Sequence, residues 1–136
     1  MYQMIIIVGN LGRDPEMRYT PGGQAVTNFN VAVNRQYQGQ DGQMVKETIW
    51  FRVSAWGKQA ETCNSYLRKG SKVLIEGRLN ADPATGGPRI WNRQDGTPSA
   101  SFEITASNVR FLSSKGEAEG MGEGMGDADS GDDIPF

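Results

Sequence analysis

The chain has 136 residues, 37% of them hydrophobic and 22% charged, which is enough for one domain of modest size with a segment left over. One cysteine and no histidine exclude an internal disulfide, a histidine-based catalytic triad and a zinc site of thiolates or imidazoles. The net charge of −2 hides a basic part, residues 1–112, with 13 Lys and Arg against 9 acids, and an acidic part, residues 113–136, with one Lys against seven acids.

The first predicted strand covers residues 4–10 and ends in the turn-prone run 9–15. Its apolar stretch, Met4 to Val8, is shorter than a membrane span or the hydrophobic part of a signal peptide, and no basic residue precedes it. We therefore expect a cytoplasmic protein with no membrane partner. Because this stretch is apolar on both faces of the strand, we also expect partner chains to cover it.

A second strand is predicted to begin near residue 25, after the turn at 20–23. Its alternating residues from Ala25 to Val33 form the predicted buried face, whereas Asn28, Asn30 and Asn34 point the other way. Residues 40–42, Gln-Asp-Gly, are typical of a hairpin turn and join this strand to the next one.

The third strand, residues 46–56, carries the most informative pattern. Its odd-numbered residues from Ile49 to Ala55 are apolar and form the predicted core face. The opposite face of a half-buried strand should be polar, yet it carries Trp50 and Trp56 on either side of Arg52. Core burial does not explain these indoles, because the alternate residues already supply the apolar face.

Residues 58–69 are predicted to form a helix, because Ala60, Cys63 and Leu67 recur at helical spacing and Gly70 is a natural stop. Strands are predicted at 72–79, with Leu79 on the same face as Val73 and Ile75, and at 101–111, with Phe102 facing inward. Between them, residues 80–99 are predicted to form a long exposed loop or hairpin around Trp91. This order predicts an all-β fold with one short helix, a five-stranded Greek-key barrel of the oligonucleotide-binding (OB) type over residues 1–112.

Residues 113–136 are rich in Glu, Gly, Asp and Ser and have no hydrophobic periodicity. We expect a disordered acidic tail, because such a segment buries too little apolar surface to offset the entropy of ordering it. Its last five residues combine two acids, apolar side chains and a carboxylate: Asp132, Asp133, Ile134, Pro135 and Phe136. They form either a docking tip for a protein partner or a disordered end of no consequence.

The exposed aromatic and basic residues suggest a ligand. Single-stranded nucleic acid offers bare base faces and a flexible phosphate chain, so sequence-independent binding needs flat aromatic surfaces and diffuse positive charge. The candidates for stacking are Tyr37, Trp50, Trp56 and Trp91, although Tyr37, between two glutamines, could equally be an ordinary surface residue. The candidates for phosphate contacts are Arg18, Arg52, Lys58, Lys69, Arg89 and Arg93, with Lys46, Lys72 and Arg78 extending the track.

No residue pattern supports catalysis. Asp14 and Glu16 lack a partner group for acid–base chemistry, and Gly57-Lys58 lacks the upstream glycine of a phosphate-binding loop. We therefore expect a protein that is not an enzyme and that needs neither a metal nor another cofactor.

Four segments resemble the bacterial single-stranded DNA-binding protein family: VGNLGRDPEMRY at 8–19, ETIWFRVSAWGK at 47–58, YLRKGSKVLIEGRL at 66–79 and the terminal DDIPF. The resemblance implies an OB-fold homotetramer that binds and protects single-stranded DNA at the nucleoid during replication, repair and recombination. It assigns base stacking to Tyr37, Trp50, Trp56 and Trp91. It also implies that residues 132–136 recruit replication, repair and recombination proteins, with Pro135 and Phe136 entering a partner pocket.

Two other interpretations of the sequence stay open. An RNA-binding or general nucleic-acid chaperone module on the same barrel would use the same stacking surfaces, because nothing here clearly reads a 2′-hydroxyl. Competition between poly(dT) and matched RNA distinguishes it. A structural or adaptor protein recruited through its tail would keep its tryptophan fluorescence unchanged when an oligonucleotide is added.

Overall fold

Strands account for most of the computed structural model, which describes residues 1–113. In this part of the chain they are β1 (Ile5–Leu11), β2 (Glu16–Tyr19), β3 (Ala25–Gln38), β4 (Met44–Trp56), β5 (Lys72–Leu79), β6 (Ile90–Asn92), β7 (Pro98–Ala100) and β8 (Phe102–Phe111), with a helix, α1 (Lys58–Tyr66), between β4 and β5. The predicted disordered tail from residue 114 onward and the predicted docking tip at 132–136 lie outside the described residues.

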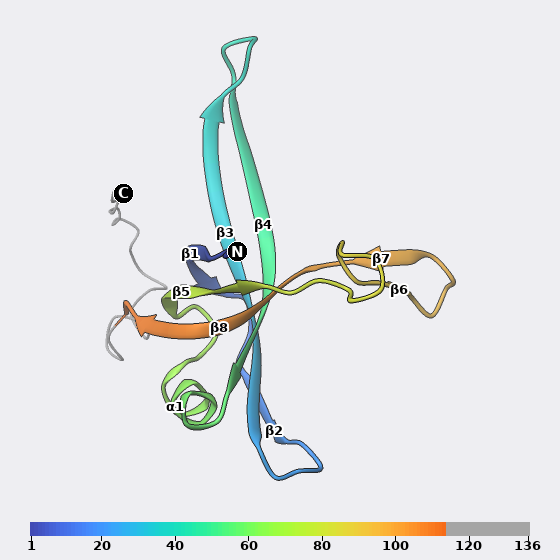
Figure 1. Cartoon of the computed structure of the whole chain (residues 1–136). Coiled ribbons are helices and arrows are strands. Elements are labelled where there is room, and N and C mark those ends of the chain that lie inside the picture. Colours follow the sequence, from blue (N-terminus) through green and yellow to red (C-terminus); the bar gives the residue numbers. More distant parts are fainter. Residues whose placement is uncertain (114–136) are drawn as a thin grey trace.

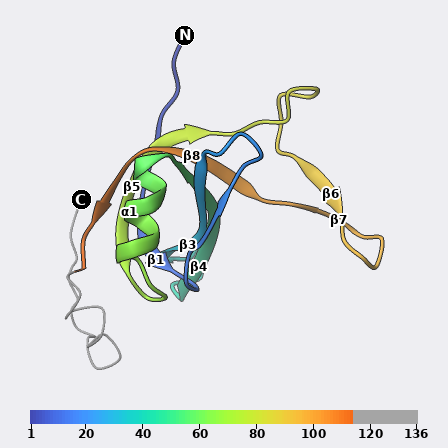
Figure 2. The same cartoon turned by 90° about the horizontal axis from the view of Figure 1, so that it is seen from below.

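Five of the strands close into a barrel in the order β1-β5-β8-β4-β3, because β3 also pairs with β1. The closure places Asn10 opposite Ala32 and Leu11 opposite Val31. The barrel pairs are antiparallel except β4–β8, which is parallel, and the short β2 pairs with the first residues of β3. Figure 2 shows α1 beside the barrel and the β6–β7 hairpin projecting away from it. The predicted all-β fold with one short helix, a five-stranded Greek-key OB barrel, is confirmed.

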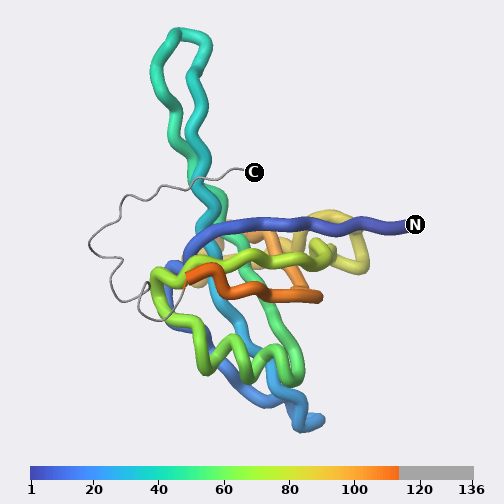
Figure 3. Tube along the Cα trace, turned by 90° about the vertical axis from the view of Figure 1, so that its left-hand side faces the viewer, coloured from blue at the N-terminus to red at the C-terminus, as the bar shows by residue number. Residues whose placement is uncertain are grey.

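Two hairpins extend beyond the barrel. The ends of β3 and β4 form a long two-stranded arm, visible at the top of Figures 1 and 3. Its turn is the predicted one: the Gly39 N–H donates to the Gln43 carbonyl at 2.8 Å, and Gly42 has a φ of 81°. The second hairpin, β6–β7, falls in the segment 80–99 that was predicted as a loop or hairpin around Trp91, and it extends one residue beyond it, to Ala100.

The core fills the barrel from the faces that alternation predicted for β3 and β4. It contains Ile7, Leu11, Phe29, Val31, Phe51, Val53, Ala55, Cys63, Leu67, Val73, Ile75, Ile104 and Ala106. Helix α1 adds Ala60 and Cys63, and the Thr27 hydroxyl donates to the Ala60 carbonyl at 2.6 Å, which fixes the helix to β3. Within residues 1–113 no helix is long and apolar enough to cross a membrane.

The helix ends at Tyr66, so the prediction that it continues to residue 69 is wrong. Leu67 has an extended backbone, with φ −92° and ψ 147°, and its side chain enters the core from this position. The next residues form a turn instead of a helical end: the Ser71 N–H donates to the Arg68 carbonyl at 2.9 Å, and Gly70 has a φ of 91°.

The predicted inward position of Phe102 is also wrong, since its side chain is 54% exposed. Leu79, predicted on the face of Val73 and Ile75, is 43% exposed although both of those residues are buried. Leu79 is the last residue of β5 and Phe102 the first of β8, where the chain leaves for the β6–β7 hairpin and returns from it. Alternation predicts which face of a strand a side chain lies on, but it does not predict at which residue the strand extends past the edge of the core. The short strand β2 was not expected either.

Two glycines permit close approach between strands of the barrel. A methyl group on Gly9 would lie 2.3 Å from the Ala32 carbonyl oxygen, where β1 meets β3. A methyl group on Gly77 would lie 2.3 Å from the Thr105 carbonyl oxygen, beside the irregular register between β5 and β8. Glycine at such positions lets backbones approach at the corners of a barrel.

Gly9→Ala is expected to lower the free energy of unfolding by about 1–3 kcal/mol, the usual cost of overpacking, because a backbone oxygen cannot move aside. Urea denaturation at a fixed protein concentration measures the effect as a lower midpoint. Gly22→Ala is the matched control, since its methyl group would lie 3.9 Å from its nearest neighbour, the Thr20 hydroxyl oxygen. Equal midpoints for the two variants would contradict the prediction.

Candidate nucleic-acid interface

The outer face of β4 carries three of the predicted side chains, Trp50, Arg52 and Trp56. On β4, Phe51, Val53 and Ala55 are buried, whereas Trp50 and Trp56 on the other face are 52% and 40% exposed. Because side chains of a strand alternate, Arg52 shares the face of the two indoles. The predicted exposure of these residues is confirmed.

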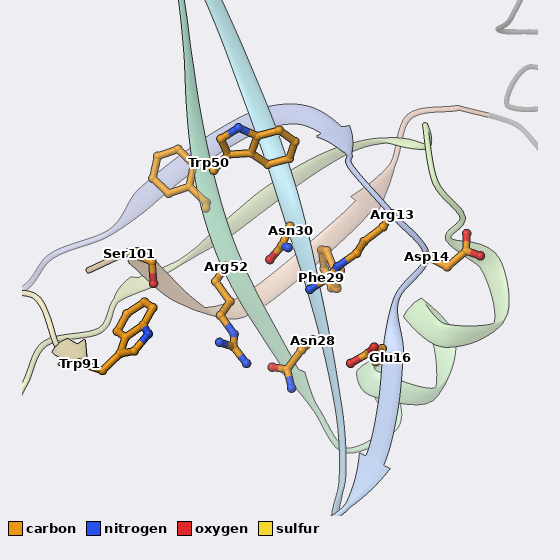
Figure 4. Close-up of a pocket in the computed structure, with 11 residues that line it drawn as sticks. Arg13, Asp14, Glu16, Asn28, Phe29, Asn30, Trp50, Arg52, Trp91 and Ser101 are labelled. Atoms are coloured by element: carbon orange, nitrogen blue, oxygen red, sulfur yellow. The ribbon is translucent and has the colours of Figure 1, made fainter. Parts of the chain in front are cut away.

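A groove lies across this face, between the turn that follows β1 and the β6–β7 hairpin. Its volume is about 300 Å³, and its lining residues come from five parts of the chain: Arg13, Asp14, Glu16, Asn28, Phe29, Asn30, Trp50, Phe51, Arg52, Trp91 and Ser101. Figure 4 shows the Arg52 side chain between the Trp91 ring on one side and Asn28 on the other, with the Trp50 indole above it. Three predicted site residues, Trp50, Arg52 and Trp91, therefore meet in one groove.

Trp91 reaches the groove from the β6–β7 hairpin. It lies opposite Ser99 in the hairpin, is 41% exposed, and borders the groove together with Ser101. The hairpin is closed by a turn in which the Asp95 carboxylate accepts hydrogen bonds from the backbone N–H and the hydroxyl of Thr97, at 3.0 and 2.7 Å. These hydrogen bonds lower the pKa of the Asp95 carboxyl.

Trp56 and Tyr37 lie outside the groove. Trp56 shares the face of Trp50 but follows it by six residues, a separation of about 20 Å along an extended strand. The register places it in one row with Val26 and Arg18. Tyr37 is on the arm, 41% exposed, and alternation assigns it to the opposite face of β3, the face of Val31.

Arg35 covers the Tyr37 ring. Its guanidinium carbon lies 4.5 Å from the centroid of the ring, and its Nε lies 3.5 Å from a Glu47 carboxylate oxygen. One face of this ring is therefore occupied by a cation of the same chain.

The arginines around the groove differ in their partners. Arg89 forms an ion pair with Glu103, in which one guanidinium nitrogen lies 3.2 and 3.0 Å from the two carboxylate oxygens. Within residues 1–113 the structure has ion pairs at Arg35–Glu47 and Arg89–Glu103, and Arg52 takes part in neither. The Arg93 guanidinium donates to the Ser99 hydroxyl at 3.1 Å inside the hairpin. Arg52 is thus the arginine at the centre of the groove whose charge is not matched by a carboxylate of the described residues.

The other predicted cations, Arg18, Lys58 and Lys69, do not line the groove. Arg18 is exposed on β2, and Lys58 is the exposed first residue of α1. Lys69 is also exposed, and its backbone N–H donates to the carboxylate of Asp14, a groove residue, at 2.8 Å.

Among the lining residues that were not predicted from the sequence, three have side-chain N–H donors: Arg13, Asn28 and Asn30. The asparagines carried a signal, since they alternate with core residues of β3 and lie on the face paired with Arg52 and Ser54. The Asn28 side-chain oxygen accepts the Ser54 hydroxyl at 2.8 Å, so its amide N–H groups remain available as donors. Arg13 carried no periodic signal, because it lies in a turn.

The only thiol of the chain, that of Cys63, does not line the groove. Cys63 is buried in the core, and burial raises the pKa of its thiol to about 12. A thiol protonated at neutral pH is a poor nucleophile and a poor metal ligand.

A closed five-stranded barrel with exposed indoles and arginines on one outer face defines an OB-fold protein with a candidate surface for nucleic acid. The sequence profile of the single-strand binding protein family matches residues 2–112, and the chain belongs to this family.

The chain is similar in sequence and in structure to known single-stranded DNA-binding proteins. The single-stranded DNA-binding protein of Wolinella succinogenes is 41% identical over 91% of this chain and 72% of its own length, and that of Helicobacter hepaticus is 44% identical over 85% and 64%. The small single-stranded DNA-binding protein of Streptomyces coelicolor aligns with a TM-score of 0.65 and 26% identity, covering 80% of this chain and 93% of that one. An SSB of Plasmodium falciparum in complex with ssDNA aligns with a TM-score of 0.67 and 25% identity, covering 82% and 96%.

Proposed function

We propose that the protein binds single-stranded DNA independently of sequence and protects it during replication, repair and recombination. The observation that carries this proposal is the exposure of three indoles, Trp50, Trp56 and Trp91, each 40–52% exposed beside arginines on an outer face. A packed domain has no structural reason to leave these large rings in water. The names of its relatives support the same ligand.

The proposed mechanism combines stacking with charge. Bases stack on the indoles, which accept any base because every base has a π-face, at about 1–3 kcal/mol for each contact. Arg52 neutralises a phosphate between Trp50 and Trp56, and Arg13, Arg18, Lys58, Lys69 and Arg93 extend the positive track. Asn28 and Asn30 donate hydrogen bonds to whichever acceptors the strand presents. Tyr37, on the arm, adds a stacking surface only when a base displaces Arg35 or uses the other face of the ring.

Trp50→Ala, Trp56→Ala and Trp91→Ala are each expected to weaken binding of poly(dT) about 5- to 150-fold, the loss that corresponds to one stacked base. Fluorescence anisotropy with a labelled oligonucleotide measures the affinity. Tyr66→Ala is the matched control: this ring is 70% exposed at the end of α1, where it contacts Phe111 instead of the groove. An equal loss in the control, or none in the tryptophan variants, would refute the proposed stacking.

Affinity for single-stranded DNA should fall with salt, and Arg52→Gln should make this dependence weaker. The magnitude of the slope of log affinity against log salt should decrease by about 0.7, the value for one phosphate contact on a single strand. Arg89→Gln should lower it less, because Glu103 already neutralises this guanidinium. In a Glu103→Gln background, the Arg89→Gln change should approach that of Arg52→Gln, since the arginine is then free for phosphate. Equal changes for both arginines in the native background would show that the ion pair does not compete with DNA.

We further propose that the chain assembles as a homotetramer, as its family resemblance implies. The support in the described residues lies at the start of β1, where Ile6 and the preceding Met4 are 56% and 48% exposed although they belong to an apolar stretch.

Sedimentation of the purified protein should give a mass about four times the 14.9 kDa of one chain. Ile6→Asp should shift the protein to smaller species, because a charge in a covered apolar patch is costly to bury. Ser65→Asp, on the exposed side of α1, is the control and should leave the mass unchanged. A monomeric native protein would overturn the proposed assembly.

The proposed role of residues 132–136 is to recruit proteins of replication, repair and recombination, with the acids facing basic residues of the partner and Pro135 and Phe136 entering its pocket. Deletion of these five residues should abolish recruitment of such proteins to DNA-bound protein without weakening its binding of poly(dT). Co-sedimentation on an immobilised oligonucleotide measures both. Deletion of residues 117–121, which shortens the tail equally, is the control. A loss of DNA affinity on removing the tip would contradict this division of roles.

We also propose that the protein acts by binding alone, without catalysis, metal or cofactor, and that it works in the cytoplasm at the nucleoid. The absence of histidine from the sequence and the buried, protonated state of its only thiol support the first point. The ligand itself supports the second, because single-stranded DNA arises where the chromosome is copied and repaired.

A further inference from the structure

The turn after β1 is in direct contact with the indole of Trp50. A methyl group on the α-carbon of Gly12 would lie 2.6 Å from Cζ3 and 2.7 Å from Cη2 of Trp50, with Cε3 next at 3.8 Å. The outer edge of the six-membered ring therefore rests on the bare backbone of Gly12. The Gly12 N–H donates to the Asn30 carbonyl at 3.1 Å, which ties this part of the turn to β3, beside the groove.

Glycine is needed here for space and not for its backbone conformation. The glycines of the described residues with a left-handed φ are Gly23, Gly42, Gly57, Gly70, Gly86 and Gly96, so the Gly12 backbone is one that alanine also adopts. The clash at Gly12 also differs from the clash at Gly9. A methyl group on Gly9 meets a backbone carbonyl, whereas one on Gly12 meets the far end of a half-exposed side chain, which can rotate away.

We propose that Gly12 is a positioning residue of the interface, whose bare α-carbon supports the Trp50 indole in the place where it receives a base. This inference rests on the proposed stacking role of Trp50. An exposed side chain that is free to rotate loses that freedom when it binds a ligand, and a side chain already supported loses less. Any side chain at position 12 lifts the ring from its support. The variant therefore folds normally but binds more weakly.

Gly12→Ala should bind poly(dT) about 2- to 12-fold more weakly than the native chain, the change expected for ordering one side chain. Its urea midpoint should match that of Gly22→Ala, the control with open space around the new methyl group. In a Trp56→Phe, Trp91→Phe background Trp50 is the only tryptophan, so Gly12→Ala should alter its emission and its quenching by acrylamide before any DNA is added. A purely structural role of Gly12 would move the urea midpoint instead.

Trp50→Phe provides the decisive background, because phenylalanine keeps a stacking ring but lacks Cζ3 and Cη2. Adding Gly12→Ala to Trp50→Phe should cost no further affinity. A further loss of affinity in this background would overturn the inference and assign the effect to another part of the turn. If Trp50→Ala weakens binding but Gly12→Ala does not, the inference fails and the proposed function stands. If Trp50→Ala has no effect, the proposed function of this residue fails.

Discussion

The continuous pairing of β3 with β4 sets both the core of the barrel and the outer face that carries the candidate interface. The register runs without interruption from Val26 opposite Trp56 to Gln38 opposite Met44. Since side chains alternate along each strand, this ladder sends Phe51 and Val53 into the barrel and leaves Trp50 and Arg52 outside. A slip of one residue would exchange the two sets, burying an arginine and exposing the core. The hydrophobic core therefore maintains the orientation of the candidate interface.

The interface is built on this rigid ribbon but completed by less regular parts of the chain. The turn after β1 contributes Gly12, on which the Trp50 ring rests, and Arg13. The β6–β7 hairpin contributes Trp91 from the opposite side of the groove. The hairpin is linked to β8 by the ion pair of Arg89 with Glu103, so one of the cations near the groove has a structural partner. A cation near the groove is therefore not always available to a ligand: Glu103 already neutralises Arg89, whereas Arg52 has no such partner among the described residues.

Much of the barrel and part of the groove follow from local pattern. Period-two alternation predicted the core faces of β3 and β4 and the exposure of Trp50 and Trp56, because a side chain in a strand has only two directions. The same rule failed for Phe102 at the barrel rim, and helical spacing failed beyond Tyr66, where Leu67 reaches the core from an extended backbone. Local patterns describe the direction of a side chain, but the distance to the nearest packing neighbour is a property of the assembled barrel.

The strand faces, the family and the aromatic and basic residue types available for binding could be predicted from the sequence, because each of these depends on order and spacing along the chain. The folded barrel was needed to show that Trp50, Arg52 and Trp91 share one groove, that Tyr37 lies apart under Arg35, and that Glu103 neutralises Arg89. The physical reason is that these contacts join residues far apart in the sequence. Their distances are set by strand register, hairpin position and barrel closure, and no local pattern encodes them.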